Sequence, residues 1–465
     1  MVKRILCLSL GGSGHYWCET IIHGTANSPE GLSGKTTKET RILDPMSQEV
    51  LGETWVCLGG PNYDRVAWTF KAYDEWQHPI LVEKSNGEKI EASWGANCCG
   101  KEWEIGPDGV EYNYEYNGLA QMVGRVKKAA NPNGVDLWTF YTTDVLGRRL
   151  TESLSAGGLS QQVSSNVYDL AGRLVSSIDG QGIQTAYREV ATSRTTIRGG
   201  VTNTTVNYLD GRTKSTSENS TLKSYHEYGV NPDGTRWTKA YSGPLGSNSP
   251  AWQKTTTDLL GRTIKDEKPG YGGTVITTTY VYNTKGQLIS TTQQPNSSTT
   301  LSEYNELGQQ TRSGLDVNNN GSLDLASPDR ISESSTWFDK DESGNYWQTR
   351  ASLIYAGNSA IPTTNSIQKT RLAGLGISSG FGLLDSEFLS TDLLGNPTTS
   401  RTYINRTAKT VTQVVSYPDS TNAAIQVTIN GLQASSTSKT GVRTDYTQDA
   451  LGRQISASSP SPSRG

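Results

Sequence analysis

A five-residue signature, D-x-x-G-R, recurs along the chain and constrains its fold more than any other feature of the sequence. Asp at the first position of a tight turn accepts hydrogen bonds from the turn's own main chain. Gly at the fourth position takes the positive φ with which the returning strand departs. The signature therefore predicts structural hairpin turns, not a catalytic site. Its four full copies comprise Asp144, Gly147 and Arg148; Asp169, Gly172 and Arg173; Asp258, Gly261 and Arg262; and Asp449, Gly452 and Arg453.

The segments between these turns are typical of β-strands. Residues 274–283 read Thr-Val-Ile-Thr-Thr-Thr-Tyr-Val-Tyr-Asn, an alternating run rich in β-branched side chains. Units this short cannot bury an apolar face alone and must stack on their neighbours. We therefore expect an all-β fold in which tandem hairpins form an extended, spiralling sheet. The Arg of each turn is expected either to pair with the Asp of a neighbouring turn or to be solvated. Looser copies of the signature lie at 208–212, 283–287, 305–309 and 392–396.

The composition agrees with many short strands and excludes several classes of partner. Hydrophobic residues make up 33% and charged residues 19%, with 49 Gly and 22 Tyr, which argues against a helical bundle. The formal net charge of −3 provides no field that attracts phosphate backbones, so no nucleic-acid partner is expected. No apolar run approaches the roughly 20 residues of a membrane-spanning helix, so the chain is not expected to span a membrane.

Composition also divides the chain into three parts. Residues 1–100 form a Cys- and Trp-rich segment with degenerate repeats, residues 101–455 form the repeat sheet, and residues 456–465 form a Ser- and Pro-rich tail that we expect to be a truncated end. An odd number of cysteines cannot pair completely within one chain, so we expect one or two disulfides or buried thiols, with the pairing open. The cysteines are Cys7, Cys18, Cys57, Cys98 and Cys99.

One insertion between repeats, at 316–329, matches the pattern of a calcium-binding loop. Side-chain oxygens alternate along it, Gly321 permits the sharp turn, and Leu323 would anchor the loop in a core. The twelfth position is Ser327 in place of a bidentate Glu, so calcium affinity would be weak, about 10⁻⁴ to 10⁻³ M. The alternative is an Asn- and Gly-rich turn without a metal. The candidate ligands are Asp316, Asn318, Asn320, Ser322, Asp324 and Asp329.

Signatures of catalysis are incomplete. The segment 31–36 imitates a phosphate-binding loop, but Pro29 stands where its first Gly is required. The segment 11–15 misses the last Gly of a nucleophile elbow. None of the four histidines lies in a recognisable arrangement with a nucleophile. We therefore expect a non-catalytic protein with no cofactor other than calcium.

The repeats resemble a known family. The run Tyr168-Asp169-Leu-Ala-Gly172-Arg173-Leu174 is similar to the YD repeat of bacterial RHS-repeat proteins, and the resemblance covers roughly residues 60 to 455. It implies a large, secreted or cell-surface protein whose repeats spiral into a hollow β-shell. In members that carry a toxin, the shell encloses a C-terminal toxin domain. The D-P-x-G closing core of the family is absent, so we expect a partial chain.

The resemblance implies a structural scaffold that encloses or presents a C-terminal toxin or effector. The partner would be the protein's own C-terminal domain, missing from this chain, or a ligand on a cell surface. The alternative is a secreted adhesion or carbohydrate-binding module of the same fold, because Tyr and Trp on sheet faces can stack on sugar rings. The same aromatic residues also stabilise sheets as cross-strand pairs without any ligand.

Overall fold

A computed structural model describes residues 2–8, 15–23, 36–58, 62–95, 100–131, 133–296, 298–305 and 308–459. Over these ranges the chain forms 37 β-strands and two single-turn 3-10 helices, and it contains no α-helix. Within these ranges, no helix has the length and apolar character needed to cross a membrane. The strands form one continuous antiparallel sheet, which confirms the all-β, extended-sheet prediction.

The strands divide into a first coil, β1 to β27, and a second coil, β28 to β37. The first half of the first coil contains β1 (Val2–Leu8), β2 (His15–His23), β3 (Thr36–Leu43), β4 (Glu49–Cys57), β5 (Asp64–Tyr73), β6 (Pro79–Lys84), β7 (Lys89–Trp94), β8 (Lys101–Ile105), β9 (Glu111–Tyr116), β10 (Met122–Lys127), β11 (Leu137–Thr143), β12 (Arg149–Ala156), β13 (Leu159–Tyr168) and β14 (Leu174–Asp179).

The second half of the first coil contains β15 (Gln184–Val190), β16 (Ser193–Arg198), β17 (Val201–Asn207), β18 (Thr213–Glu218), β19 (Thr221–Val230), β20 (Arg236–Ser242), η1 (Gly246–Asn248), β21 (Trp252–Thr257), β22 (Thr263–Pro269), η2 (Tyr271–Gly273), β23 (Val275–Tyr282), β24 (Leu288–Gln294), β25 (Ser298–Tyr304), β26 (Gln310–Asp316) and β27 (Arg330–Lys340). The second coil contains β28 (Tyr346–Ala356), β29 (Thr363–Arg371), β30 (Ser378–Ser379), β31 (Gly382–Thr391), β32 (Pro397–Asn405), β33 (Thr410–Ser416), β34 (Ala424–Ile429), β35 (Leu432–Thr437), β36 (Arg443–Gln448) and β37 (Gln454–Ser458).

Strands that follow each other in the chain pair in the sheet, except that β29 pairs with β31 around the two-residue strand β30. Because every strand reverses direction, the hairpin turns alternate between the two edges of the sheet. We call the edge that carries the turns at 44–48, 74–78, 117–121, 144–148, 169–173 and 258–262 the turn edge. We call the opposite edge, with the turns at 84–88, 106–110 and 179–183, the return edge.

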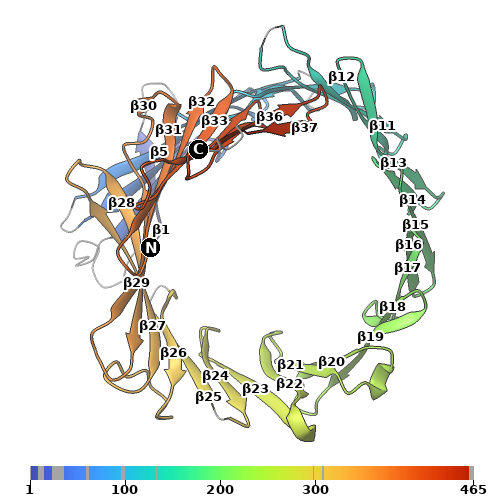
Figure 1. Ribbon diagram of the computed structural model, residues 1–465, viewed down its shortest axis with the longest axis vertical. Coiled ribbons are helices and arrows are strands. Elements are labelled where there is room, and N and C mark those ends of the chain that lie inside the picture. Colours follow the sequence, from blue (N-terminus) through green and yellow to red (C-terminus); the bar gives the residue numbers. More distant parts are fainter. Residues whose placement is uncertain are drawn as a thin grey trace, which may run out of the picture.

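The sheet winds around an open centre (Figure 1). After one circuit, the orange and red strands of the second coil come to lie alongside the blue and teal strands near the start of the chain. The accessible surface is 27327 Å², whereas a compact protein of 50.4 kDa would expose about 17,000 Å². The coil is therefore one sheet thick, with both faces open to solvent.

Little of this sheet is stabilised by a hydrophobic core. One cluster of buried apolar side chains is found in the described part of the chain, formed by Leu323, Ile331 and Tyr355 with Leu301 and Leu325 packed against it. Elsewhere, ladder hydrogen bonds and cross-strand side-chain pairs must supply most of the stability. The ladder runs without interruption across residue 100, because β7 pairs with β8; the division there is one of composition.

Among the cysteines, Cys57 is buried at 1% exposure and Cys18 is disulfide-bonded. The side chain of Cys7, and Cys98 and Cys99 altogether, lie outside the described residues, as do residues 460–465 of the tail.

Candidate functional site

Each full copy of the signature folds as a turn held by its own Asp. In the first copy, Asp144 Oδ1 accepts hydrogen bonds from the N–H groups of Leu146 (2.9 Å) and Arg148 (3.0 Å). The N–H of Gly147 donates to Asp144 O at 3.0 Å, and Gly147 has a φ of +80°. The same Gly-to-Asp bond and a positive φ recur at Gly172, Gly261 and Gly452.

The Arg of each signature pairs with the Asp of its own turn. The Nε–Oδ2 distances are 2.5 Å for Arg148, 2.8 Å for Arg173, and 2.7 Å for both Arg262 and Arg453. Of the two alternatives expected for this Arg, the charge pair with a neighbouring turn is wrong, because four residues of separation in a tight turn bring the two side chains together. Solvation is found in part, since the paired side chains of Arg173 and Arg453 are 58% and 54% exposed. The main-chain N–H and the guanidinium of Arg173 hold the pKa of Asp169 below its usual value.

The Tyr of the repeat connects one turn to the preceding one. Tyr282 precedes the turn at 283–287, and its hydroxyl donates to the carbonyl of Thr263 at 2.8 Å, directly after Arg262. The guanidinium carbon of Arg262 also lies 4.7 Å from the centre of the Tyr282 ring. This double contact keeps successive turns in fixed relation along the turn edge. The same Tyr-to-carbonyl bond joins Tyr73 to Glu49, Tyr168 to Arg149, Tyr228 to Thr213 and Tyr304 to Leu288.

The second coil contacts the first along a seam, where the turn edge of β28 to β37 meets the return edge of β5 to β13. Asn86 Nδ2 donates to Asp385 Oδ1 at 2.9 Å, across 299 residues of sequence. Arg406 Nη2 lies 2.7 Å from Glu91 Oε2. Further contacts join Lys127 Nζ to Asn430 O, Asn430 Nδ2 to Lys128 O (3.1 Å), Lys409 Nζ to Ala129 O (2.8 Å), Arg453 Nη1 to Gln161 Oε1 (2.9 Å) and Tyr346 Oη to Asp64 Oδ2 (2.7 Å).

Side chains and turns make these seam contacts: among the strand pairings of the described residues, β27 with β28 connects the coils along the chain, and none crosses the seam. The coils approach closely at Gly109, which has a φ of +79°. A Cβ at this position would lie 2.1 Å from the carbonyl oxygen of Arg406. Burial, together with the nearby negative charge of Glu88, raises the pKa of Asp385. Burial also lowers the pKa of Lys127. The seam therefore removes charged groups from water, which is typical of a specific contact between two surfaces.

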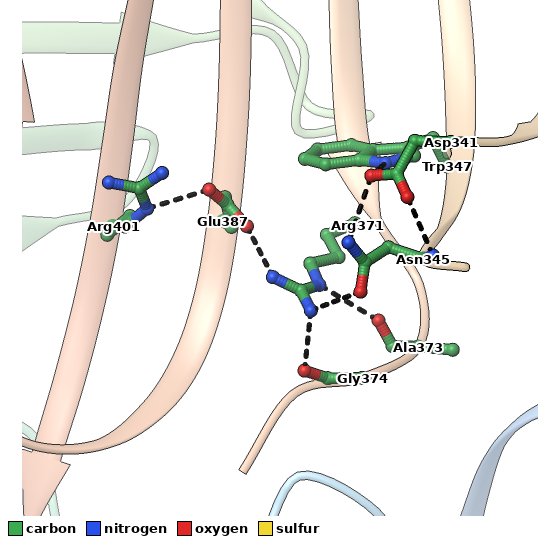
Figure 2. Close-up of polar contacts among 8 residues, drawn as sticks. All are labelled: Asp341, Asn345, Trp347, Arg371, Ala373, Gly374, Glu387 and Arg401. Carbon is green, nitrogen blue, oxygen red and sulfur yellow. Dashed lines mark hydrogen bonds and ion pairs between the residues drawn. The ribbon is translucent and has the colours of Figure 1, made fainter. Parts of the chain in front are cut away.

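A buried charge network lies where the second coil reaches the seam (Figure 2). Arg371 Nη1 and Glu387 Oε2 are 2.7 Å apart, and their side chains are only 9% and 7% exposed. Arg371 also donates to Asn345 Oδ1 (2.5 Å) and to the carbonyls of Ala373 (3.0 Å) and Gly374 (2.8 Å). It thereby fixes the loop after β29.

Two neighbouring groups complete the network in Figure 2. Arg401 Nε donates to the second oxygen of Glu387 at 2.7 Å. Asp341 Oδ2 accepts from Trp347 Nε1 and from Asn345 Nδ2, both at 2.9 Å. The bonds from Trp347 and Asn345 hold the pKa of Asp341 at about 2. The loop fixed by Arg371 leads to Gly376, where a Cβ would lie 3.0 Å from Asn86 O across the seam.

The candidate calcium loop connects β26 and β27 at the return edge. Asp316 and Asp329 are 3% and 1% exposed. Asp316 accepts from the N–H groups of Asn320 (3.2 Å) and Gly321 (2.8 Å), and Asp329 accepts from those of Val317 (2.9 Å) and Asp324 (3.0 Å). The buried carboxylates are thus satisfied by the main chain of the loop itself.

The remaining candidate ligands of this loop lie nearer the surface. Asn320 Nδ2 donates to Asp324 Oδ2 at 2.6 Å, Asn320 Oδ1 accepts from the N–H of Ser322 (2.9 Å), and Asn318 Oδ1 accepts from the N–H of Asn320 (3.0 Å). Gly321 has a φ of +82°. No group of three or more acidic, His or Cys side chains in the described residues is arranged to hold a metal ion. Calcium binding stays a prediction.

The seam and the Arg371 network were not found by sequence reasoning. Their residues fall outside the repeated signature, and the seam pairs are about 300 positions apart, as for Lys127 and Asn430 at 303. The one local signal was Asn86-Gly87, a dipeptide that favours hairpin turns. It predicts a turn, but not the strand that the turn will contact.

No protein-family model matches the chain, and no curated protein matches it in sequence. Solved structures with some likeness include a chain of the Photorhabdus luminescens Tc holotoxin pore with a mutated TccC3, at 8% identity and a TM-score of 0.32. A second is TcdB2-TccC3 without its hypervariable C-terminal region, at 9% identity and a TM-score of 0.30. Both matches cover 96% of this chain and 35% of the other, so the chain spans about a third of their length. TM-scores this low assign neither a fold nor a function.

Proposed function

We propose that this protein is a non-catalytic structural scaffold, part of an RHS-type β-shell of a secreted or cell-surface bacterial protein. Its role is to enclose or present a C-terminal toxin or effector that is missing from this chain. The observation that supports the proposal best is the coil itself. A sheet one layer thick winds past a full circuit around an open centre, and its second coil is fastened to the first by seam contacts.

The distribution of specific contacts also favours a scaffold. The Tyr and Arg contacts between successive turns, such as Tyr282 to Thr263, set the spacing of the hairpins. The buried Arg371–Glu387 pair is enclosed by main-chain carbonyls and by Arg401, so its polar groups are engaged in structural bonds.

Small-angle X-ray scattering tests the hollow shape. A compact domain of this length would have a radius of gyration of about 23 Å, and the open coil must exceed that value clearly. Reading the DNA downstream of the Gly465 codon tests the role. An in-frame continuation that encodes a D-P-x-G core and a variable last domain would support enclosure of an effector. A stop codon without such a cassette would overturn it.

A groove in the second coil favours the alternative, a carbohydrate-binding adhesion module. One aromatic ring, Tyr417, lies there among carboxylate, amide and hydroxyl groups, the combination that sugar rings require. Binding to a glycan array that is lost in Tyr417→Ala would select this alternative, and an array without hits would remove it. The groove is lined by Ser390, Asp392, Asn396, Thr398, Tyr417, Pro418 and Asp419.

A further inference from the structure

The turn edge of the first coil carries a row of exposed apolar side chains at its tips. Five of the six turns that define this edge hold a large apolar residue at their third position: Met46 (65% exposed), Trp76 (57%), Leu119 (64%), Leu146 (74%) and Leu260 (77%). The turn at 169–173 holds the small Ala171 there. Single exposed apolar residues are normal on a protein surface, but a repeated apolar position along one edge marks an interaction site.

The same position is buried in one turn of the chain. Leu451 occupies the third position of the turn at 449–453, on the turn edge of the second coil, and is only 5% exposed. Two other residues of this turn contact the first coil: Ala450 Cβ lies 3.0 Å from where a Cβ on Gly157 would stand, and Arg453 donates to Gln161. Thus the same motif position is buried where its turn rests on a return edge.

The electrostatics of the turn permit this docking. At the seam, Arg453 keeps its bond to Asp449 at 2.7 Å while Nη1 reaches Gln161. The exposed turns carry the same internal pairs, Arg148 with Asp144 and Arg262 with Asp258. Docking of a turn therefore buries its apolar tip while its charge pair stays intact. Separating the pair would leave a buried charge without its partner, at a cost in free energy.

From the identical motif, covered at the seam and uncovered elsewhere, we infer that the turn edge of the first coil docks on the return edge of the second coil of another copy of this chain. Each chain carries both surfaces, because the return edge of its second coil is also uncovered and apolar. That edge exposes Ile361 (81%), Leu393 (57%), Leu394 (83%) and Val442 (47%). The contact extends the internal seam interface from one chain to the next.

This contact is heterologous, since two different surfaces meet. Each added copy leaves one uncovered turn edge and one uncovered return edge at the ends of the assembly, so association is head-to-tail and has no fixed size. The inference rests on the fold and the seam, and it holds whether or not the shell encloses an effector.

Analytical ultracentrifugation of the full chain over a wide concentration range tests the inference. We expect a mean mass that rises with concentration. In the double variant Leu119→Asp, Leu146→Asp, which changes two tips in the sector that the seam spans, the concentration needed for association should rise by about tenfold or more for each Leu that is removed from the interface. Val281→Asp is the matched control, because Val281 lies on the sheet within β23 and is 50% exposed. It should associate as the wild type does.

Circular dichroism melts establish that each variant is folded. Cross-linking of a mixture of isotopically labelled and unlabelled chains gives a second readout without substitutions. Links between Lys101, at the turn-edge end of β8, and Lys439, on the return edge, should join labelled to unlabelled chains. A monomer at every concentration, or a double variant that associates like the wild type, would overturn the inference.

Discussion

The Arg371–Glu387 pair offers a direct test of how the second coil is held at the seam. In Arg371→Ala, Glu387 loses one of its two cationic partners, and the carbonyls of Ala373 and Gly374 lose their donor. The loop between β29 and β31 is then no longer tied to β29. We expect this loop to open, and the seam contact between Asn86 and Asp385 to open with it.

The size of the effect follows from burial. Removing one partner of a buried ion pair costs about 3–5 kcal/mol, because the other charge stays buried. Arg401 remains bonded to Glu387 at 2.7 Å, so we expect the lower end of that range. Arg401 is 40% exposed, and its removal should cost no more than about 1 kcal/mol, as for surface pairs. Arg401→Ala is therefore the matched control.

Hydrogen exchange with mass spectrometry measures these local openings directly, which a global melt of a repeat array does not. In Arg371→Ala, the opening equilibrium of residues 372–384 should rise by about a hundredfold, the factor that corresponds to about 3 kcal/mol. Residues 84–88 across the seam should also exchange faster. Equal effects of Arg371→Ala and Arg401→Ala, or unchanged exchange at 84–88, would refute the reasoning.

Three further predictions address the seam, the network and the calcium loop. Gly109→Ala should loosen the seam far more than Gly182→Ala. Both glycines have a φ near +80°, but of the two added Cβ atoms only the one at Gly109 would have a neighbour, Arg406, within 4 Å. Hydrogen exchange over residues 404–410 measures the loosening. Asp341, with a pKa lowered from 3.8 to about 2, contributes stability that is present above about pH 4 and lost as the pH falls towards 2. Asp341→Asn should remove that pH dependence from urea unfolding, and an unchanged acid limb would contradict the assignment. In the wild type, the melting temperature should be higher in millimolar calcium than in EDTA, and in Asp316→Ala the two temperatures should be equal. Equal melting temperatures of the wild type in EDTA and in calcium would contradict calcium binding.

Much of the fold was predictable because its determinants are local. The Asp, Gly and Arg of the signature are all within five residues, so turn chemistry alone predicted the hairpins and hence an extended sheet. The partner of Arg was mispredicted for the same reason: a bond inside the turn, as between Arg148 and Asp144, competes with a bond between turns and costs less side-chain order. The role of Tyr282 as a donor to Thr263 depends on strand register, which the sequence pattern left open.

The seam was beyond sequence reasoning because its position depends on the curvature of the whole sheet. The residues that meet, such as Glu91 and Arg406, are brought together by the accumulated twist and bend of the many hairpins between them. A small change in the angle between successive hairpins moves the second coil by whole strands relative to the first. No pairwise pattern in the sequence encodes that sum.

This architecture separates local stability from closure. In a repeat array each hairpin depends on its neighbours, so the stability of the coil is close to a sum of local terms. The seam contacts add to that sum only once the intervening hairpins are formed, because they close a loop of about 300 residues, as Asn86 and Asp385 do. Substitutions at the turns should therefore raise hydrogen exchange in the hairpins nearby. Substitutions at Gly109 or Arg371 should instead weaken the contact between the two coils and leave distant hairpins intact. The seam can therefore part without unfolding of the sheet.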